Sequence, residues 1–194
     1  MKVLGIMGSP RNEGNTDVLL DKALEGAGAS GAETEKIVIN DLDISPCQEV
    51  EYENVNEAGL SVVDDDMHLI FRKVREADVL ILASPTFFGS LSTQTKMMID
   101  RFQCVWLAKN IFNKGIFTGE KRGAFICAQA TGREDFFDNA KSIVKHFFAT
   151  IGVKYQEEVF CPGVDKKGSV LEKPEFLEKA YKLGRKMAIL TKEE

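Results

Sequence analysis

The chain has 194 residues, of which 44% are hydrophobic and 28% charged, and its formal net charge at pH 7 is −5. This length predicts a single domain over residues 1–194 with a full hydrophobic core. The negative charge argues against nucleic-acid binding, which needs clustered Lys and Arg. No apolar run approaches the roughly 20 residues of a membrane span, and no signal peptide precedes the first strand pattern. We therefore expect a soluble, cytoplasmic protein with neither nucleic acid nor membrane as a partner.

Strand-like and helix-like segments alternate along the whole chain. The predicted strands lie at 2–8, 34–39, 78–84, 122–128 and 153–160, and the predicted helices at 15–28, 67–76, 92–107, 135–151 and 173–191. Such alternation predicts a parallel sheet that is covered by helices on both faces.

The strands differ in a way that predicts their order. Residues 3–7, 79–83 and 124–128 are nearly all apolar, as expected for central strands that are buried on both sides. Residues 34–39 and 153–160 mix apolar and charged side chains, which is typical of edge strands. The sequence therefore predicts an α/β, flavodoxin-like doubly wound sandwich: a five-stranded parallel sheet of order 2-1-3-4-5 with helices on both faces.

The loop after the first strand carries the most informative pattern. Residues 8–16 read Gly-Ser-Pro-Arg-Asn-Glu-Gly-Asn-Thr and lead into a helix. Unpaired backbone amides at a helix N-terminus, with hydroxyls and an arginine beside them, favour a bound phosphate. The loop matches neither the P-loop nor the Gly-x-Gly-x-x-Gly fingerprint, and it suits a terminal phosphate monoester. The alternative is a polar turn with an ordinary N-cap.

Two further loops should converge on this one. In an open parallel sheet, ligands bind beyond the carboxyl ends of the strands, where the strand order switches. The loop at 84–92 has aromatic residues, a proline and a glycine, and the loop at 129–133 has small residues that let backbone approach a ligand. The three loops together suit a ligand with a phosphate and a flat ring.

The long connection at 40–66 is rich in carboxylates. Of its acidic residues, Asp64, Asp65 and Asp66 precede a predicted helix, and we favour helix capping over metal binding for them. The cysteines Cys47, Cys104, Cys127 and Cys161 are scattered without a Cys-x-x-Cys pair. This spacing indicates free thiols and no metal site.

Two motifs carry a resemblance to a known family. Gly8-Ser9-Pro10-Arg11 with Gly14-Asn15-Thr16, and Ser84-Pro85-Thr86-Phe87-Phe88-Gly89-Ser90 with Gln94, Lys96 and Asp100-Arg101, stand at the expected places. With these motifs, the chain resembles the NADPH-dependent FMN reductase family, nearest its iron–sulfur flavoprotein-like branch. The likeness covers nearly the whole chain.

The resemblance implies non-covalent FMN and NADPH or NADH as co-substrate. Ser9, Arg11, Asn15 and Thr16 would hold the FMN phosphate; Pro85, Thr86, Phe87, Phe88, Gly89 and Ser90 would line the isoalloxazine; Thr131 and Gly132 would approach its pyrimidine edge. Asp100 and Arg101 would be structural, either as an ion pair near the helix end or as a subunit contact. The resemblance also implies a homodimer or homotetramer.

One departure from the iron–sulfur branch concerns the cysteines. That branch carries a compact cysteine cluster after the second strand, whereas this sequence has only Cys47 there, with Val50 three residues later. A four-thiolate cluster needs its ligands. We therefore expect no iron–sulfur cluster.

The expected reaction is hydride transfer from the nicotinamide to FMN and on to a small acceptor, with no catalytic side chain. For Arg133, two interpretations are equally supported: it stabilises the reduced flavin, or it is a solvated surface residue. Three alternatives stay open: an electron carrier without nicotinamide activity, a quinone, nitro- or azo-compound reductase on the same scaffold, and a non-catalytic domain.

Overall fold

The computed structural model describes residues 1–48, 63–113, 115–117 and 119–189. The strands are β1 (Lys2–Met7), β2 (Glu33–Val38), β3 (Val79–Phe87), β4 (Ser90–Leu91), β5 (Lys121–Ala128) and β6 (Val153–Cys161). The helices are α1 (Asn15–Ala29), α2 (Met67–Glu76), α3 (Thr93–Asp100), α4 (Gln103–Asn110), α5 (Phe136–Thr150) and α6 (Pro174–Ala188). Two short 3-10 helices, η1 (Ile39–Asp41) and η3 (Ser169–Glu172), complete the described elements.

The main sheet has the order β2-β1-β3-β5-β6, and all of its strand pairs are parallel. This confirms the predicted order 2-1-3-4-5, because the additional strand β4 pairs only with β3. Leu4 at the centre of β1 pairs with Glu35 on the edge strand and with Leu80 on the central strand. The apolar and mixed strands thus lie where their composition predicted.

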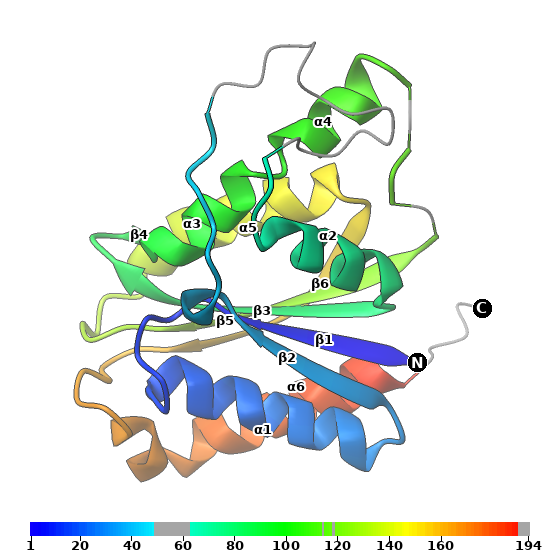
Figure 1. The fold of residues 1–194 in the computed structure, drawn as a ribbon. Coiled ribbons are helices and arrows are strands. Elements are labelled where there is room, and N and C mark those ends of the chain that lie inside the picture. The colour runs from blue at the N-terminus through cyan, green and yellow to red at the C-terminus, as the bar shows by residue number, and fades with distance from the viewer. Residues whose placement is uncertain (49–62, 114, 118, 190–194) are drawn as a thin grey trace.

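Helices cover both faces of the sheet, and each face has its own hydrophobic core. Figure 1 shows α1 and α6 beneath the sheet and α2, α3, α4 and α5 above it. Leu20, Ile81 and Met187 belong to the lower core, whereas Leu80, Phe102 and Phe147 belong to the upper one. Among the described residues, no helix is long and apolar enough to cross a bilayer.

The prediction of one helix over 92–107 was wrong. The chain forms α3 and α4 instead, with a break at Arg101 and Phe102. Both residues at the break are buried, at 3% and 2% exposure. Ser92 begins α3 as a capping residue, because its Oγ accepts the N–H of Thr95 at 3.2 Å.

A hairpin at the end of β3 was not predicted either. Phe87 pairs with Ser90 in the antiparallel β3–β4 ladder, so Phe88 and Gly89 form the turn. Their φ angles are +50° and +72°. Positive φ at both central residues is typical of type I′ turns, in which Asn-Gly is the usual sequence.

Close contact between α1 and α6 depends on two glycines. A Cβ on Gly184 would lie 1.7 Å from the carbonyl oxygen of Ala23, and one on Gly26 would lie 2.1 Å from that of Tyr181. The two helix backbones therefore touch directly beneath the sheet. Any larger side chain at these positions would push the helices apart.

This contact predicts opposite effects for two helical glycine substitutions. We expect Gly184→Ala to lower the free energy of unfolding by about 1–3 kcal/mol, the range of overpacked cores. Gly28→Ala is the matched control, because its new Cβ would meet only Thr34 Cγ2 at 4.0 Å, and it should raise stability by about 0.5 kcal/mol. Urea denaturation of both variants measures the difference. A Gly184→Ala variant as stable as wild type would contradict the direct backbone contact.

Candidate functional site

A cleft lies at the carboxyl ends of the parallel strands, where their loops meet at the left of Figure 1. Its empty space is about 620 Å³, counted out to the open mouth. The predicted site residues that line it are Ser9, Arg11, Asn15, Thr16, Pro85, Thr86 and Phe87. The cleft thus brings the loop after β1 and the end of β3 together, as the switch-point rule predicts.

The cleft is lined by residues of the described part of the chain. The other predicted site residues are not among them. Phe88 is fully exposed at the tip of the hairpin, with Gly89 and Ser90 beside it. Thr131 and Gly132 lie in the loop after β5, where the Thr131 hydroxyl accepts the N–H of Arg133 at 3.2 Å.

The end of the cleft at α1 is built to attract an anion. Gly14 is the N-cap of α1 and has no side chain to cap the first turn. The Ser9 hydroxyl accepts the N–H of Arg11 at 3.1 Å, and the Asp17 carboxylate accepts the N–H of Glu13 at 2.7 Å. The loop is therefore held in shape by its own side chains, while the positive end of the helix dipole faces the cleft.

The Asn15 side chain makes hydrogen bonds within the protein that the sequence did not predict. Its Nδ2 donates to the carbonyl of Lys166 at 2.9 Å, and its Oδ1 accepts the N–H of Val170 at 3.0 Å. The side chain thus ties the start of α1 to the segment after β6. One amide hydrogen is left for a ligand.

Buried hydroxyls join the two ligand-side loops beneath the cleft. The hydroxyls of Ser92 and Thr95 both donate to the carbonyl of Gly8, and they lie 2.8 Å from each other. The N–H of Gly8 donates to the carbonyl of Ala83 at 2.8 Å. A Cβ on Gly8 would lie 1.8 Å from Thr95 Oγ1, so only glycine fits at this position of the loop.

A buried cysteine lies behind Thr86. The Thr86 hydroxyl lies 3.1 Å from Cys127 Sγ. Burial raises the pKa of the Cys127 thiol to about 12, although the hydrogen bond with Thr86 lowers it slightly. The thiol is therefore protonated at neutral pH and is no nucleophile.

Gln129 lines the cleft and is 3% exposed. Its Nε2 donates to the carbonyl of Arg133, which fixes the orientation of the amide. Its Oε1 is buried and has no hydrogen-bond donor within the described part of the chain. A buried amide oxygen without a donor is unfavourable, so an N–H group of a ligand would stabilise this position.

One wall of the cleft was not predicted from the sequence. Val164, Asp165 and Lys167 line it from residues 162–170, which we call the arch. The arch follows β6, an edge strand, and only the loops after strands 1, 3 and 4 of the predicted sheet were expected to form the cleft. Gly163 and Gly168 have positive φ. These two glycines are the feature of the sequence from which tight turns in this loop could have been predicted.

Comparison with known proteins identifies the family of the chain. Residues 1–153 match the family model of the NADPH-dependent FMN reductases. The chain belongs to the NADPH-dependent FMN reductase family. The resemblance that the two motifs indicated is thereby confirmed.

Relatives of this FMN reductase family member fall in the expected branch. An iron–sulfur flavoprotein of Methanocaldococcus jannaschii is 41% identical over 114 residues, which are 59% of this chain and 58% of that protein. An iron–sulfur flavoprotein of Methanosarcina thermophila is 37% identical over 101 residues, 52% of each protein. The chain thus spans little more than half the length of these curated relatives.

A solved structure matches the fold over the full chain. The NAD(P)H:quinone oxidoreductase from Methanothermobacter marburgensis has a TM-score of 0.78 and 19% sequence identity, covering 100% of this chain and 99% of that one. At this identity the likeness shows the flavodoxin-like fold alone.

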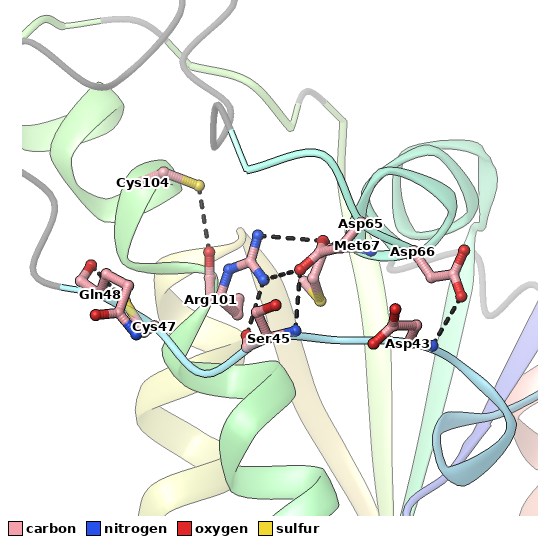
Figure 2. A network of polar contacts seen from close by, with 9 residues as sticks. All are labelled: Asp43, Ser45, Cys47, Gln48, Asp65, Asp66, Met67, Arg101 and Cys104. Atoms are coloured by element: carbon pink, nitrogen blue, oxygen red, sulfur yellow. Dashed lines mark hydrogen bonds and ion pairs between the residues drawn. The ribbon is translucent and has the colours of Figure 1, made fainter.

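Arg101 and Asp65, which do not line the cleft, form a buried ion pair, as Figure 2 shows. Their side chains are 2% and 4% exposed. Arg101 also donates to the carbonyl of Ser45 at 2.9 Å, and Asp65 accepts the N–H groups of Ser45 and Met67 at 3.0 and 3.1 Å. The predicted structural role of Arg101 is correct, but its partner is Asp65, since Asp100 pairs with Lys96.

This cluster joins the two ends of the 43–66 segment. Beside it, the N–H of Asp43 donates to the Asp66 carboxylate at 2.8 Å, and the N–H of Asp66 donates to the carbonyl of Asp43 at 3.1 Å. Asp65 thus accepts the first N–H of α2, as the capping hypothesis proposed, while Asp66 makes no side-chain cap. The interior of the segment, at 49–62, lies outside the described residues.

Burial raises the pKa of Asp65, but the hydrogen bonds from Arg101, Ser45 and Met67 and the charge of Arg101 outweigh it. The net pKa of Asp65 is therefore lowered. Because the folded value lies below the unfolded value of about 3.9, the pair stabilises the fold fully above that pH. The contribution is lost as the pH falls through the folded pKa.

We expect Arg101→Met to lower the free energy of unfolding by about 3–5 kcal/mol at neutral pH, because the Asp65 carboxylate stays buried without its counter-charge. The difference from wild type should shrink at an acidic pH below the lowered folded pKa of Asp65, where the carboxyl is protonated. Lys96→Met is the control, because it breaks an exposed pair with Asp100 and should cost less than about 1 kcal/mol. Urea unfolding at both pH values measures these differences. Equal losses in the two variants would contradict a stabilising role for the buried pair.

Proposed function

We propose that the chain is an FMN-dependent NAD(P)H oxidoreductase that passes a hydride from the nicotinamide to bound FMN and on to a small acceptor such as a flavin or quinone. One observation carries the proposal: a single cleft joins an uncapped helix N-terminus with Arg11 to the apolar wall of Pro85 and Phe87. This combination fits a ligand with a phosphate at one end and a flat ring at the other.

At the phosphate end, Arg11 supplies a charge and Ser9 and Thr16 supply hydroxyls. The guanidinium of Arg11 also donates to the carbonyl of Asp165 at 3.2 Å, which holds it beside α1. Backbone N–H groups of the first turn of α1 complete the set of donors. A phosphate dianion accepts hydrogen bonds from such donors.

At the ring end, the chain binds and orients the ligand. FMN, when bound, supplies the hydride and electron chemistry. Pro85, Thr86 and Phe87 would lie against the ring, and backbone N–H groups of residues 130–132 would face its pyrimidine edge. Among the described residues, no group donates to Gln129 Oε1, and the N–H of a pyrimidine ring would satisfy it.

Arg133 has another partner in the structure. Its guanidinium donates to the two carboxylate oxygens of Asp135 at 3.1 and 2.7 Å and lies 4.6 Å from the Phe136 ring centroid. It is not among the residues lining the cleft. We therefore assign the ring-edge contacts to backbone donors and to Gln129.

We further propose that FMN acts here without an iron–sulfur cluster, unlike in the relatives named for one. Cys104, Cys127 and Cys161 are buried on three different elements, and only Cys47 precedes α2. Within the described residues, no group of three or more His, Cys, Asp or Glu side chains could hold a metal ion. The expected homodimer or homotetramer stays a prediction.

The phosphate assignment is tested by Arg11→Ala combined with Thr16→Ala. Each lost bond should cost about 0.5–3 kcal/mol, so FMN affinity should fall at least about fivefold. Arg72→Ala on the exposed face of α2 removes a charge elsewhere and should leave affinity unchanged. Fluorescence titration with FMN measures all three proteins. Wild-type affinity in the double variant would remove the phosphate loop from the proposal.

The activity is tested by the absorbance spectrum of the purified protein with FMN, followed by anaerobic addition of NADPH and then NADH. We expect flavin bands that one of the nicotinamides bleaches. Flavin that neither nicotinamide reduces would favour an electron carrier, and no flavin uptake would favour a non-catalytic domain. Iron in the protein, with broad absorption beyond the flavin bands, would contradict the cluster-free proposal.

A further inference from the structure

The arch, residues 162–170, bridges two ligand-side loops. The N–H of Gly163 donates to the carbonyl of Thr131 at 3.0 Å, and the N–H of Val164 donates to that of Gln129 at 2.9 Å. On the other side, Arg11 and Asn15 donate to the carbonyls of Asp165 and Lys166. The arch is thus fixed to the loop after β5 and to the loop before α1.

Its position in the chain sets the arch apart from the rest of the cleft. The match to the family model covers residues 1–153, so the arch lies outside the matched region. It nevertheless supplies three lining residues, including Lys167. A wall of the cleft therefore comes from a segment that the family match does not describe.

The charges of the cleft suggest what Lys167 does. Arg11 and Lys167 are the cationic side chains that line the described cleft, and Asp165 is the acidic one. A phosphate monoester carries close to two negative charges at neutral pH. The positive charge of Arg11 balances one of these negative charges, and its guanidinium also donates a hydrogen bond to the Asp165 carbonyl. A second cation would balance the remaining charge, and Lys167 lines the same cleft.

We propose that Lys167 is a phosphate-binding residue of the cleft, delivered by the arch to the end where Arg11 lies; this rests on the proposed FMN function. Lys167 Nζ now lies 3.0 Å from Glu13 Oε2, with side chains that are 56% and 85% exposed. Such an exposed pair contributes little stability, so the ammonium is free to exchange Glu13 for a phosphate. Glu13 holds the lysine near the loop that binds the anion.

A purely structural role for Lys167 makes a different prediction. If its pair with Glu13 served only to hold the arch, then loss of either partner would disturb the cleft for any flavin. If Lys167 binds phosphate, its loss affects only flavins that carry one. Riboflavin, which shares the ring and lacks the phosphate, separates the two roles.

The experiment measures dissociation constants for FMN and riboflavin by fluorescence titration of wild type, Lys167→Ala, Lys167→Arg, Lys166→Ala and Glu13→Gln. Lys166→Ala is the matched control: it removes the same charge from the same arch, its side chain does not line the cleft, and its carbonyl bond to Asn15 is kept. Thermal melting of each variant checks that the fold is intact.

We expect Lys167→Ala to weaken FMN about five- to tenfold, as for a partly exposed charge-assisted bond, with riboflavin affinity within about twofold of wild type. Lys167→Arg should retain the preference for FMN. Lys166→Ala should bind both flavins like wild type, and Glu13→Gln should bind FMN at least as tightly.

Two results would overturn the assignment: an equal loss for both flavins in Lys167→Ala, or no loss for either while wild type binds FMN. A wild-type protein that binds neither flavin would instead refute the proposed function itself, and the role of Lys167 with it.

Discussion

All strands of the main sheet are parallel, and the position of the cleft follows from this constraint. Parallel strands end at one edge, so the loops after β1, β3, β5 and β6 meet there although they are far apart in sequence. The switch in strand order between β1 and β3 opens the space between the first two of these loops. The sheet therefore determines which loops meet, and the loop sequences determine what they can bind.

Buried polar contacts hold these loops in place. The hydroxyls of Ser92 and Thr95 fix the carbonyl of Gly8 beneath the cleft, and the N–H groups of Gly163 and Val164 tie the loop after β6 to the loop after β5. A buried polar group without a partner is costly, so such contacts favour one arrangement over its alternatives. The cleft is preorganised in this way, which lowers the entropy cost of binding a ligand.

The sequence predicted the sheet better than the site, and the reason is physical. Strand order follows from composition, which each strand shows on its own. The β3–β4 turn has Phe88 at the position where Asn would indicate positive φ. The usual Asn-Gly signal of a hairpin is therefore missing from the local sequence. The pairing of Arg101 with Asp65, 36 residues apart, and the approach of the arch to α1 depend on tertiary contacts. Periodicity contains no information about either.

The arch also shows how a family site can vary without change in its motifs. Residues 8–16 and 84–90 lie within the matched region, and they present backbone, hydroxyls, the apolar wall of Pro85 and Phe87 and one arginine to the cleft. Backbone donors bind a phosphate or a ring edge but discriminate weakly between ligands of similar shape. Charged side chains on a segment that follows the edge strand add or remove a counter-charge without disturbing the sheet. Ligand preference in this chain would then depend on residues that a family match does not cover, and Lys167 is such a residue.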